Sequence, residues 1–416
     1  MTTAWYRSIT AEQWRALIAA KLGWVLDAMD FLLYVMALGH LKAYFGFDDA
    51  TAGLLGTITL LVSAGGGLFF GVIADRFGRA RALTWTILIF SLCSLGAATS
   101  QTLVQLLFWR LLLGIGMGGE WASGAVLVSE TWPAEHRSKA VAIMQSGWAL
   151  GYILAATLAA LVLDVLPLGD EAWRWLFVVG ALPAFFTLWI RRRVPEPAAW
   201  VRRQGTVRQR VNPFAVLFGP PLWRRTVLAI VLTACVQFGY WGLFFWLPSF
   251  LARPIDQGGA GMTILRSMAW LIPMQVGAYL GYLSFGFISD WMGRRRTFMI
   301  FLALAALLVP IYAQLARSPI SLMLLGPVIG FVGHGYFSVF GAFLAELFPT
   351  EARATGQGLA YNGGRALGAL APYTIGVLAT LPNVGIGSAL GLTSAFFLAG
   401  ALLMLAFPDT SHKRLE

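Results

Sequence analysis

The chain consists of long apolar segments separated by short polar ones. A helix needs about 20 mostly apolar residues to cross the hydrocarbon core of a bilayer. Runs of about this length or longer lie at 16–41, 50–74, 82–99, 104–128, 140–163, 173–190, 226–251, 267–289, 297–316, 319–346, 356–380 and 388–407. Lipid offers the backbone no hydrogen-bond partner, and these runs are too long for barrel strands. The pattern therefore predicts an all-α membrane protein with twelve transmembrane helices.

Composition agrees with this prediction and charge gives it an orientation. The chain is 58% hydrophobic and only 12% charged, whereas soluble domains are about 25% charged. With the N-terminus inside, the inner loops and tails contain 23 of the 30 Lys and Arg residues. Cytoplasmic loops of membrane proteins carry such an excess, so we expect both termini to be cytoplasmic. The same asymmetry explains the net charge of +11 without a nucleic-acid partner.

One long hydrophilic stretch, 191–225, divides the chain. It contains nine arginines and separates six predicted helices from six others. We interpret it as a basic cytoplasmic linker that contacts anionic lipid headgroups. The predicted domains are a six-helix bundle over 1–190, this linker, and a second six-helix bundle over 226–416.

Two charged patterns occur once in each half. The sequence GVIADRFGR at 71–79 has a counterpart, GFISDWMGR, at 286–294. The sequence ETWPAEHR at 130–137 has a counterpart, ELFPTEAR, at 346–353. The first pair is offset by 215 positions and the second by 216. Two patterns that recur at nearly one offset indicate an internal repeat.

These repeated residues predict a cytoplasmic gate. Acids and arginines at helix ends can pair with each other and with helix dipoles, and exposed pairs of this kind contribute only about 0–1 kcal/mol, which suits contacts that must separate. Gly71 and Gly286 are expected to let neighbouring helices come close. Short turns with inside-positive charge are the alternative, but they leave the repeated spacing unexplained. The predicted gate residues are Gly71, Asp75, Arg76, Gly78, Arg79, Glu130, Arg137, Gly286, Asp290, Gly293, Arg294, Glu346 and Arg353.

Ionisable residues within the predicted spans indicate a proton site. Such residues are costly in a membrane and usually face a cavity or a partner. They are Asp27, Asp30, Arg110, Glu120, His334 and Arg365. Three acids accompany two arginines, so one carboxylate lacks a fixed cation and would bind a proton readily, unless a protonated histidine balances the set. We predict proton coupling at Asp27 or Asp30 with Arg110 as counter-charge, and at Glu120 as second candidate. A static ion network that only fixes helix packing is the alternative.

Arg365 is a candidate for binding an anion. No acid lies at similar depth in the second half, and the planar guanidinium matches a carboxylate with two hydrogen bonds. Asn362 adds a polar group one turn earlier. A salt bridge between the halves, to one of the three acids, is the alternative. Further candidates for the cavity lining are Gln145, Gln237, Tyr240, Trp241, Gln275, Tyr279, His334 and Tyr336.

Together these motifs resemble a known family. The segment 71–81 is similar to the loop 2–3 signature of the major facilitator superfamily, and RLLLGIG at 110–116 is similar to its helix-4 signature. The resemblance implies two pseudo-symmetric six-helix bundles around a central cavity, with alternating access by rocking of the halves. The glycines at 114–119 lie in an apolar run without a preceding strand, so we assign them to helix packing rather than to a nucleotide loop.

Shorter motifs resemble one branch of that family. Asp27-Ala-Met-Asp30 resembles the helix-1 pattern of proton-coupled organic-acid symporters, and 118–121 and 130–140 look most like the sialate/lactate:proton branch. This implies symport of a small organic anion, such as lactate, pyruvate, sialate or an aromatic acid, across a bacterial inner membrane. We expect a functional monomer that has no cofactor besides the proton and no metal, and we expect no enzyme activity. A sugar or polyol symporter and a non-transporting membrane sensor remain as alternatives.

Overall fold

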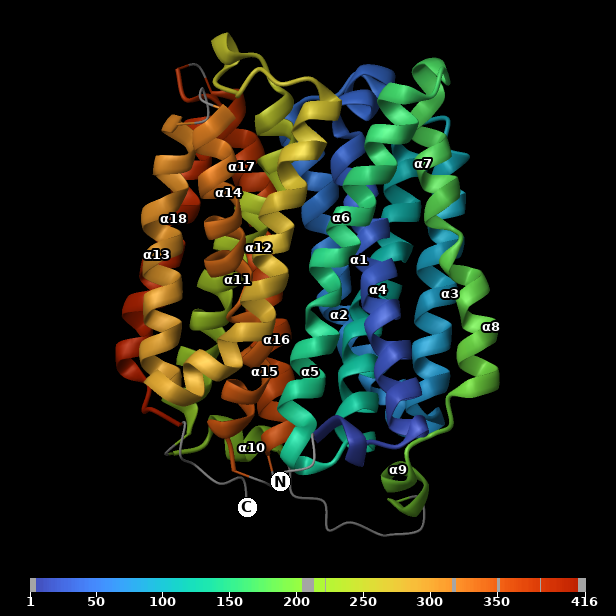
Figure 1. The fold of residues 1–416 in the computed structure, drawn as a ribbon, viewed down its shortest axis with the longest axis vertical. Coiled ribbons are helices and arrows are strands. Elements are labelled where there is room, and N and C mark those ends of the chain that lie inside the picture. Colours follow the sequence, from blue (N-terminus) through green and yellow to red (C-terminus); the bar gives the residue numbers. More distant parts are fainter. Residues whose placement is uncertain are drawn as a thin grey trace.

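The computed structural model describes residues 5–203, 213–220, 222–315, 319–349, 352–381 and 383–410. These residues form helices and connecting loops, and none of them belongs to a β-strand (Figure 1). The prediction of an all-α protein is confirmed. Eleven helices of the described chain are long and apolar enough to span a bilayer. The remaining predicted span, the eleventh in chain order at 356–380, is formed by two shorter helices, of which the first contains Asn362 and Arg365.

The first half contains six spans, two of which are interrupted. Its helices are α1 (Ala11–Phe45), α2 (Asp49–Phe77), α3 (Arg79–Ala98), α4 (Leu103–Thr131), α5 (Arg137–Gln145), α6 (Gly147–Ala160), α7 (Ala172–Gly180) and α8 (Pro183–Arg193). The fifth span bends at Ser146 between α5 and α6. The sixth bends between α7 and α8, where Pro183 cannot continue the hydrogen-bond ladder.

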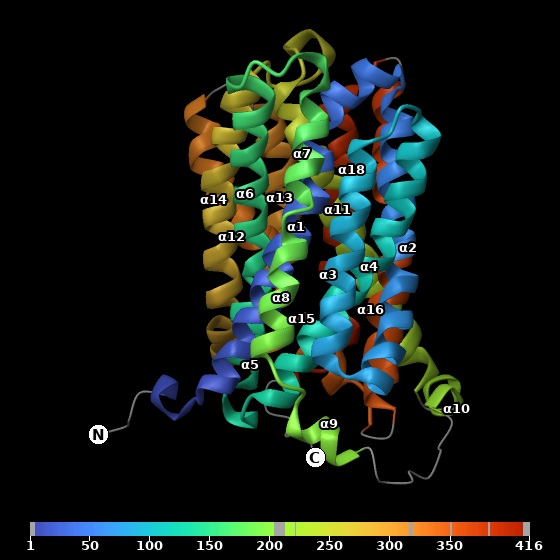
Figure 2. The same cartoon turned by 90° about the vertical axis from the view of Figure 1, so that its right-hand side faces the viewer.

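The second half repeats this plan. Its helices are α11 (Trp223–Ala252), α12 (Ile264–Met292), α13 (Arg294–Leu315), α14 (Pro319–His334), α15 (Phe337–Glu346), α16 (Arg353–Gly368), α17 (Ala371–Thr380) and α18 (Gly385–Leu403). The short helices α9 (Ala198–Arg203) and α10 (Pro213–Phe218) lie in the predicted linker, of which 204–212 is outside the described residues. Figure 2 shows both at the end of the molecule where the termini lie.

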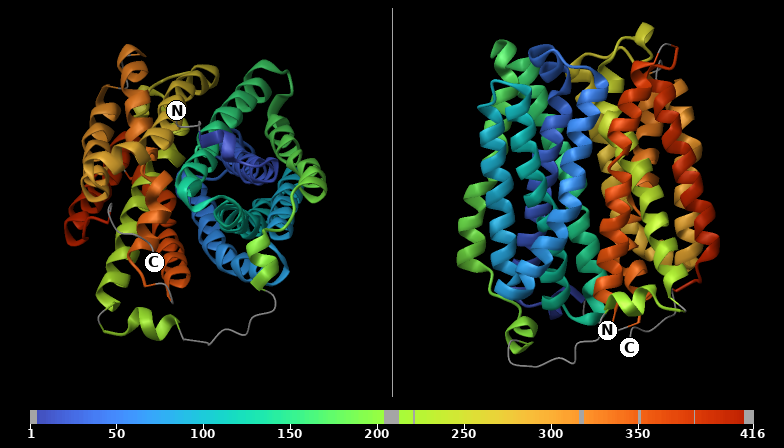
Figure 3. Two further views of the ribbon diagram at one scale, coloured as in Figure 1. Left: turned by 60° about the horizontal axis from the view of Figure 1, so that its bottom comes forward. Right: turned by 180° about the vertical axis from the view of Figure 1, so that it is seen from behind.

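The helices form two bundles side by side (Figure 3). In the first bundle α4 packs along α2 and α3, and α1 packs along α6. In the second bundle α14 packs along α12, and α11 packs along α16 and α18. The bundles meet where α2 contacts α16 and α17, and where α5 and α6 contact α12. The first and last described residues lie at one end of the molecule, here called the terminal end, and the opposite end is called the distal end (Figure 1).

Glycines allow the closest helix contacts in both bundles. A Cβ atom on Gly118 of α4 would overlap the carbonyl oxygen of Ser63 on α2. In the second bundle a Cβ on Gly330 of α14 would overlap the carbonyl oxygen of Met274 on α12. Small residues let helices approach in this way within lipid. The assignment of the glycines at 114–119 to helix packing is confirmed.

Candidate functional site

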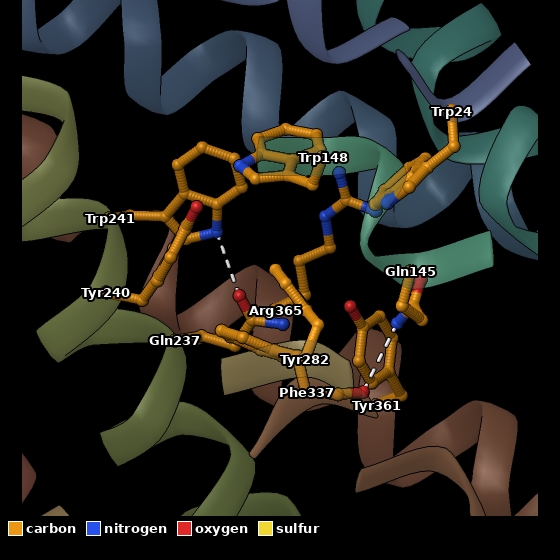
Figure 4. A pocket seen from close by; sticks show the side chains of 10 residues that line it. All are labelled: Trp24, Gln145, Trp148, Gln237, Tyr240, Trp241, Tyr282, Phe337, Tyr361 and Arg365. Carbon is orange, nitrogen blue, oxygen red and sulfur yellow. Dashed lines mark hydrogen bonds between the residues drawn. The ribbon is translucent and has the colours of Figure 1, made fainter. Parts of the chain in front are cut away.

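A small cavity lies between the two bundles and is lined by side chains from both (Figure 4). Its volume is about 30 Å³. It is lined by Trp24, Gln145, Trp148, Gln237, Tyr240, Trp241, Tyr282, Phe337, Tyr361 and Arg365. A space of this size holds water but no organic acid. The described conformation is therefore closed around its centre.

The walls of the cavity are mainly aromatic. The rings of Trp24 and Trp148 have centroids 4.9 Å apart, and Trp148 meets Trp241 edge to face at 5.7 Å. Trp24 and Trp148 come from the first bundle and Trp241 from the second, so the rings join the two halves. The indole Nε1 of Trp241 donates a hydrogen bond to Oε1 of Gln237 at 2.8 Å, which fixes both side chains.

Arg365 provides the positive charge of this cavity. It lies on α16, is only 3% exposed, and its guanidinium points away from its own bundle toward Trp24 and Trp148 (Figure 4). Its electrostatic partners include Asp27 on α1. The cation thus extends from the second half toward the acids of the first half.

Asp27 and Glu120 form the acidic side of the same region. Both are buried, at 1% and 0% exposure, and they repel each other electrostatically. A Cβ atom on Gly23 would lie 2.6 Å from Oε1 of Glu120, so this glycine makes room for the carboxylate one turn before Asp27. Both oxygens of Glu120 and Oδ2 of Asp27 make no hydrogen bond with the described residues. Two buried acids and one arginine therefore share the centre of the protein.

Asp30 and Arg110 form a separate pair nearer the distal end. Asp30 interacts electrostatically with Arg110, whose guanidinium carbon lies 4.2 Å from the ring centroid of Tyr34. On its other side, Asp30 lies with Ser94 against Gly180. The predicted counter-charge therefore faces Asp30, while Asp27 faces Arg365. The predicted acids and arginines thus form two neighbouring groups, which interact because Asp27 and Asp30 repel each other.

The predicted cavity residues also divide into two groups. Those that line the cavity are Gln145, Gln237, Tyr240, Trp241 and Arg365. Those that lie outside its lining are Asn362, His334, Tyr336, Gln275 and Tyr279. Five lining residues were not predicted: Trp24, Trp148, Tyr282, Phe337 and Tyr361. In an apolar helix an aromatic residue that faces a cavity has the same sequence signal as one that faces lipid.

The five candidates that lie outside the cavity lining have other surroundings. His334 is buried behind the wall, with Nδ1 3.0 Å from the carbonyl oxygen of Gly330 and its ring against Tyr240. Asn362 donates to the carbonyl oxygen of Gly358 at 3.0 Å and lies at the contact with α2. The other three are Tyr336 and Gln275, which are fully buried, and Tyr279, whose ring lies 5.2 Å below Nζ of Lys21.

A thin layer of side chains separates the cavity from the terminal end. Trp121 of α4 stacks on Tyr361 of α16 with ring centroids 4.2 Å apart. Its Nε1 donates to Oε1 of Gln145 at 3.1 Å, and Nε2 of Gln145 donates to the carbonyl oxygen of Phe337 at 3.3 Å. This layer joins α4 and α5 of the first half to α15 and α16 of the second.

The distal end is closed by backbone packing and a buried ion pair. A Cβ on Gly53 would overlap the carbonyl oxygen of Pro372, so α2 and α17 are in backbone contact. Asp49, at the start of α2, accepts from Lys42 at 2.5 Å and from Arg253 at 2.5 Å. Arg253 follows α11, so this pair joins the halves.

A neighbouring carboxylate caps the same helix. Asp48 accepts a hydrogen bond from the backbone N–H of Thr51 at 2.9 Å. This bond holds the pKa of Asp48 below its ordinary value. Asp48 therefore stays charged at the start of α2, where a negative charge complements the helix dipole.

The repeated motifs at the terminal end form matching ion pairs within each half. Arg79 binds Glu130 through Nε at 2.9 Å and Nη2 at 3.0 Å, and Nη1 lies 2.8 Å from Asp75. In the second half Arg294 binds Glu346 at 2.9 Å. Each of these pairs joins consecutive spans of one bundle. The expected pairing of acids with arginines is present, and the gating role remains a prediction.

The other predicted gate residues have varied settings. Gly78 and Gly293 have φ values of 115° and 89°, a backbone region that favours glycine. Gly71 and Gly286 do not make the expected close contacts: a Cβ on Gly71 would meet no atom within 4 Å, and one on Gly286 would meet only Val339 at 3.9 Å. The exposed members are Arg76, Arg137 and Asp290, while Arg353 is half-buried.

Two helix caps at this end were not predicted. Glu196 accepts hydrogen bonds from the backbone N–H groups of Arg79, Ala80 and Arg81 at 2.6, 3.1 and 3.1 Å. Asp409 accepts from the N–H of Arg294 at 3.2 Å, which is the matching position on α13. The sequence contains a signal for them, because Val-Pro-Glu after the sixth span and Phe-Pro-Asp after the twelfth are a third repeated pair.

Two helical bundles around a buried, charged cavity, with contacts that close it on both sides, define a multi-pass membrane transporter. The Major Facilitator Superfamily model matches residues 22–284, more than half of the chain. The chain belongs to this superfamily and is not an enzyme. The solved structure of a D-xylose-proton symporter has the same fold, with a TM-score of 0.77 at 18% identity over 97% of this chain and 99% of that one.

The chain is similar to several bacterial transporters over nearly its whole length. It is 36% identical to a probable 4-methylmuconolactone transporter of Cupriavidus pinatubonensis, covering 99% of this chain and 94% of that one. It is 32% identical to a cis,cis-muconate transport protein of Acinetobacter baylyi, covering 97% of each chain. It is 31% identical to the sialic acid transporter NanX of Escherichia coli, covering 98% and 97%. The predicted likeness to organic-acid transporters is confirmed.

Proposed function

We propose that this protein is a proton-coupled symporter of a small organic anion in a bacterial inner membrane, with both termini in the cytoplasm. The observation that carries the proposal is Arg365, a buried cation in an aromatic cavity between the two halves. A guanidinium in such a place binds a carboxylate more strongly than in water, because little solvent competes.

The lining favours an unsaturated or aromatic acid. Tryptophan and tyrosine rings offer flat apolar faces to a conjugated or aromatic substrate, with Arg365 for its carboxylate. The relatives named for muconate and sialic acid handle carboxylic acids. The sugar alternative has less support, since the amides of Gln145 and Gln237 already make hydrogen bonds.

Two acids that share one arginine provide a means of coupling proton binding to binding of the substrate anion. Asp27 and Glu120 repel each other, so a proton on one of them relieves a cost that burial makes large. Arg365 balances the remaining carboxylate while the cavity holds no substrate. When a substrate carboxylate takes Arg365, protonation of Asp27 removes the charge left behind. Anion and proton then bind together and leave together, with the terminal layer and the distal contact opening in turn.

The test is uptake into proteoliposomes with an imposed pH gradient, acidic outside. We expect at least one of muconate, benzoate, nicotinate, sialate, lactate and pyruvate to accumulate, with alkalinisation outside recorded by a pH-sensitive dye. Glucose is the neutral comparison. Accumulation of glucose but of none of the acids would overturn the proposal.

Variants test the coupling separately from binding. Asp27→Asn and Glu120→Gln should retain exchange of the substrate across the membrane but lose accumulation driven by the pH gradient. Glu12→Gln, at an exposed position in the first turn of α1, is the matched control and should accumulate substrate normally. If both acid variants still accumulate substrate, the coupling site lies elsewhere, and Asp30→Asn becomes the deciding variant.

A further inference from the structure

A second cavity lies at the distal end between α1 and α11. Its volume is about 240 Å³, eight times that of the central cavity by the same measure. It is lined by Val35, Met36, Gly39, His40, Lys42, Pro248, Ser249, Ala252, Arg253, Pro254 and Gln257. We call this space the distal vestibule. It has room for a small organic acid, and it lies on the predicted outer side.

The charged residues in the vestibule wall are cations. Lys42 and Arg253 line it together with His40, and the lining contains no carboxylate. Lys42 comes from the first half and Arg253 from the second. Two nearby acids, Asp164 and Asp170, interact with His40 from outside the lining, and the exposed Asp48 interacts with Lys42. The wall itself therefore presents positive charge to an entering solute.

Asp49 lies behind this wall and binds both cations. Its Oδ1 is 2.5 Å from Nζ of Lys42, and its Oδ2 is 2.5 Å from Nη2 of Arg253. The carboxylate side chain is 7% exposed, while those of Lys42 and Arg253 are 29% and 14% exposed. One internal carboxylate thus holds two partly accessible cations, one from each half. A second carboxylate that entered the vestibule could compete for both.

We propose that the distal vestibule is an entry site for the carboxylate of the substrate, and that a carboxylate bound there takes Arg253 from Asp49 and releases the distal contact between the halves. This rests on the proposed transport of an organic anion. A neutral solute could not replace Asp49 in this way. The vestibule would therefore select anions before they reach Arg365 in the central cavity.

The first experiment measures the charge of the vestibule with a Ser249→Cys variant in its wall. A methanethiosulfonate reagent with a sulfonate group should label this position faster than one with a trimethylammonium group. Arg253→Gln or Lys42→Gln should reduce this preference about tenfold, because the cations steer anions into the site. Benzoate should slow the labelling and its neutral isostere benzamide should not. Cys93 and Cys235 are buried, and the protein without the Ser249→Cys change reports their background.

The second experiment measures release of the distal contact with a Thr57→Cys variant. Thr57 is 3% exposed and accepts a hydrogen bond from the N–H of Tyr373 across the two halves at 3.1 Å. Benzoate should increase its labelling several-fold. Asp49→Asn should produce this increase without benzoate, because the neutral side chain no longer holds Arg253.

These outcomes separate the inference from the proposed function. The entry site would be overturned, with organic-anion transport left intact, by two results together. Arg253→Gln would transport benzoate with the wild-type KM, and benzoate would not slow the labelling of Ser249→Cys. If benzoate slows the labelling of Ser249→Cys but no tested carboxylate is transported, both the entry role and the proposed function are overturned. Equal labelling by the two reagents would show that the vestibule has no preference for anions and would also overturn the inference.

Discussion

Arg365 and Asp27 interact electrostatically across the boundary between the two halves of the chain. Their helices, α16 and α1, are separated by more than 300 positions in the sequence. The interaction places a substrate-binding candidate and a proton-binding candidate in one region. Arg110, the counter-charge predicted for Asp27 or Asp30, interacts with Asp30. If both candidates have the proposed roles, a substrate bound at Arg365 changes the electrostatic environment of Asp27.

Two replacements of Arg365 should weaken substrate binding to different degrees. Arg365→Lys keeps the charge but loses the planar pair of donors, so we expect KM to rise about tenfold, whereas Arg365→Gln should abolish saturable uptake. Uptake kinetics in proteoliposomes measure both effects. The sulfonate labelling of Ser249→Cys described above should be unchanged in these variants, which controls for folding. A KM in Arg365→Lys equal to that of the wild type would show that the carboxylate binds elsewhere.

Replacing Arg79 should reduce stability far more than replacing its neighbour Arg76. The Arg79 side chain is 5% exposed and binds Glu130 through two nitrogens, so Arg79→Gln removes a largely buried ion pair with two hydrogen bonds. A loss of about 3–5 kcal/mol is typical of such a change. Arg76 is exposed, and Arg76→Gln should cost no more than about 0.5 kcal/mol. Thermal unfolding in detergent, followed by tryptophan fluorescence, compares the two. Equal melting temperatures would contradict the prediction.

Two glycines should respond in opposite ways to a larger side chain. Gly118→Ala should prevent correct packing of α4 on α2, because its Cβ would overlap the Ser63 carbonyl oxygen. Gly71→Leu should fold with a normal melting temperature, since no atom lies within 4 Å of a Cβ there. If a helix closes over Gly71 when the protein changes conformation, Gly71→Leu should nevertheless slow transport. Size-exclusion profiles and uptake rates test both statements. Full transport by Gly71→Leu would remove Gly71 from the predicted gate.

Glu196 should stabilise the start of α3. It accepts three backbone N–H groups that a helix start otherwise leaves unpaired. Removal of a helix cap costs about 0.5–2 kcal/mol, and Glu196→Ala should lower the melting temperature accordingly. Glu135→Ala, at an exposed position, is the control and should have little effect. Hydrogen exchange at residues 79–81 should increase in Glu196→Ala alone. Unchanged exchange there would show that the cap contributes nothing to α3.

The sequence by itself determined the architecture and the inventory of charges. The apolar runs fix the spans because a bilayer requires about 20 apolar residues per crossing and internal pairing of every backbone group. The repeated motifs identified a set of acids and arginines at helix ends that can pair, and the structure pairs Arg79 with Glu130 and Arg294 with Glu346. Acids and arginines in apolar runs were visible because each one is costly there and needs a partner or a cavity.

Only the tertiary structure decided which charges meet and which rings form the cavity. Asp49 and Arg253 lie 204 positions apart, and nothing in either local sequence relates them. Trp24 and Trp148 line the cavity, while Trp85 is 40% exposed on the outer surface, although all three lie in similar apolar helices. A membrane helix is apolar on every side, because lipid and protein interior favour the same side chains. Its sequence therefore fixes that it spans the membrane, and its packing against the other helices decides which side faces the substrate.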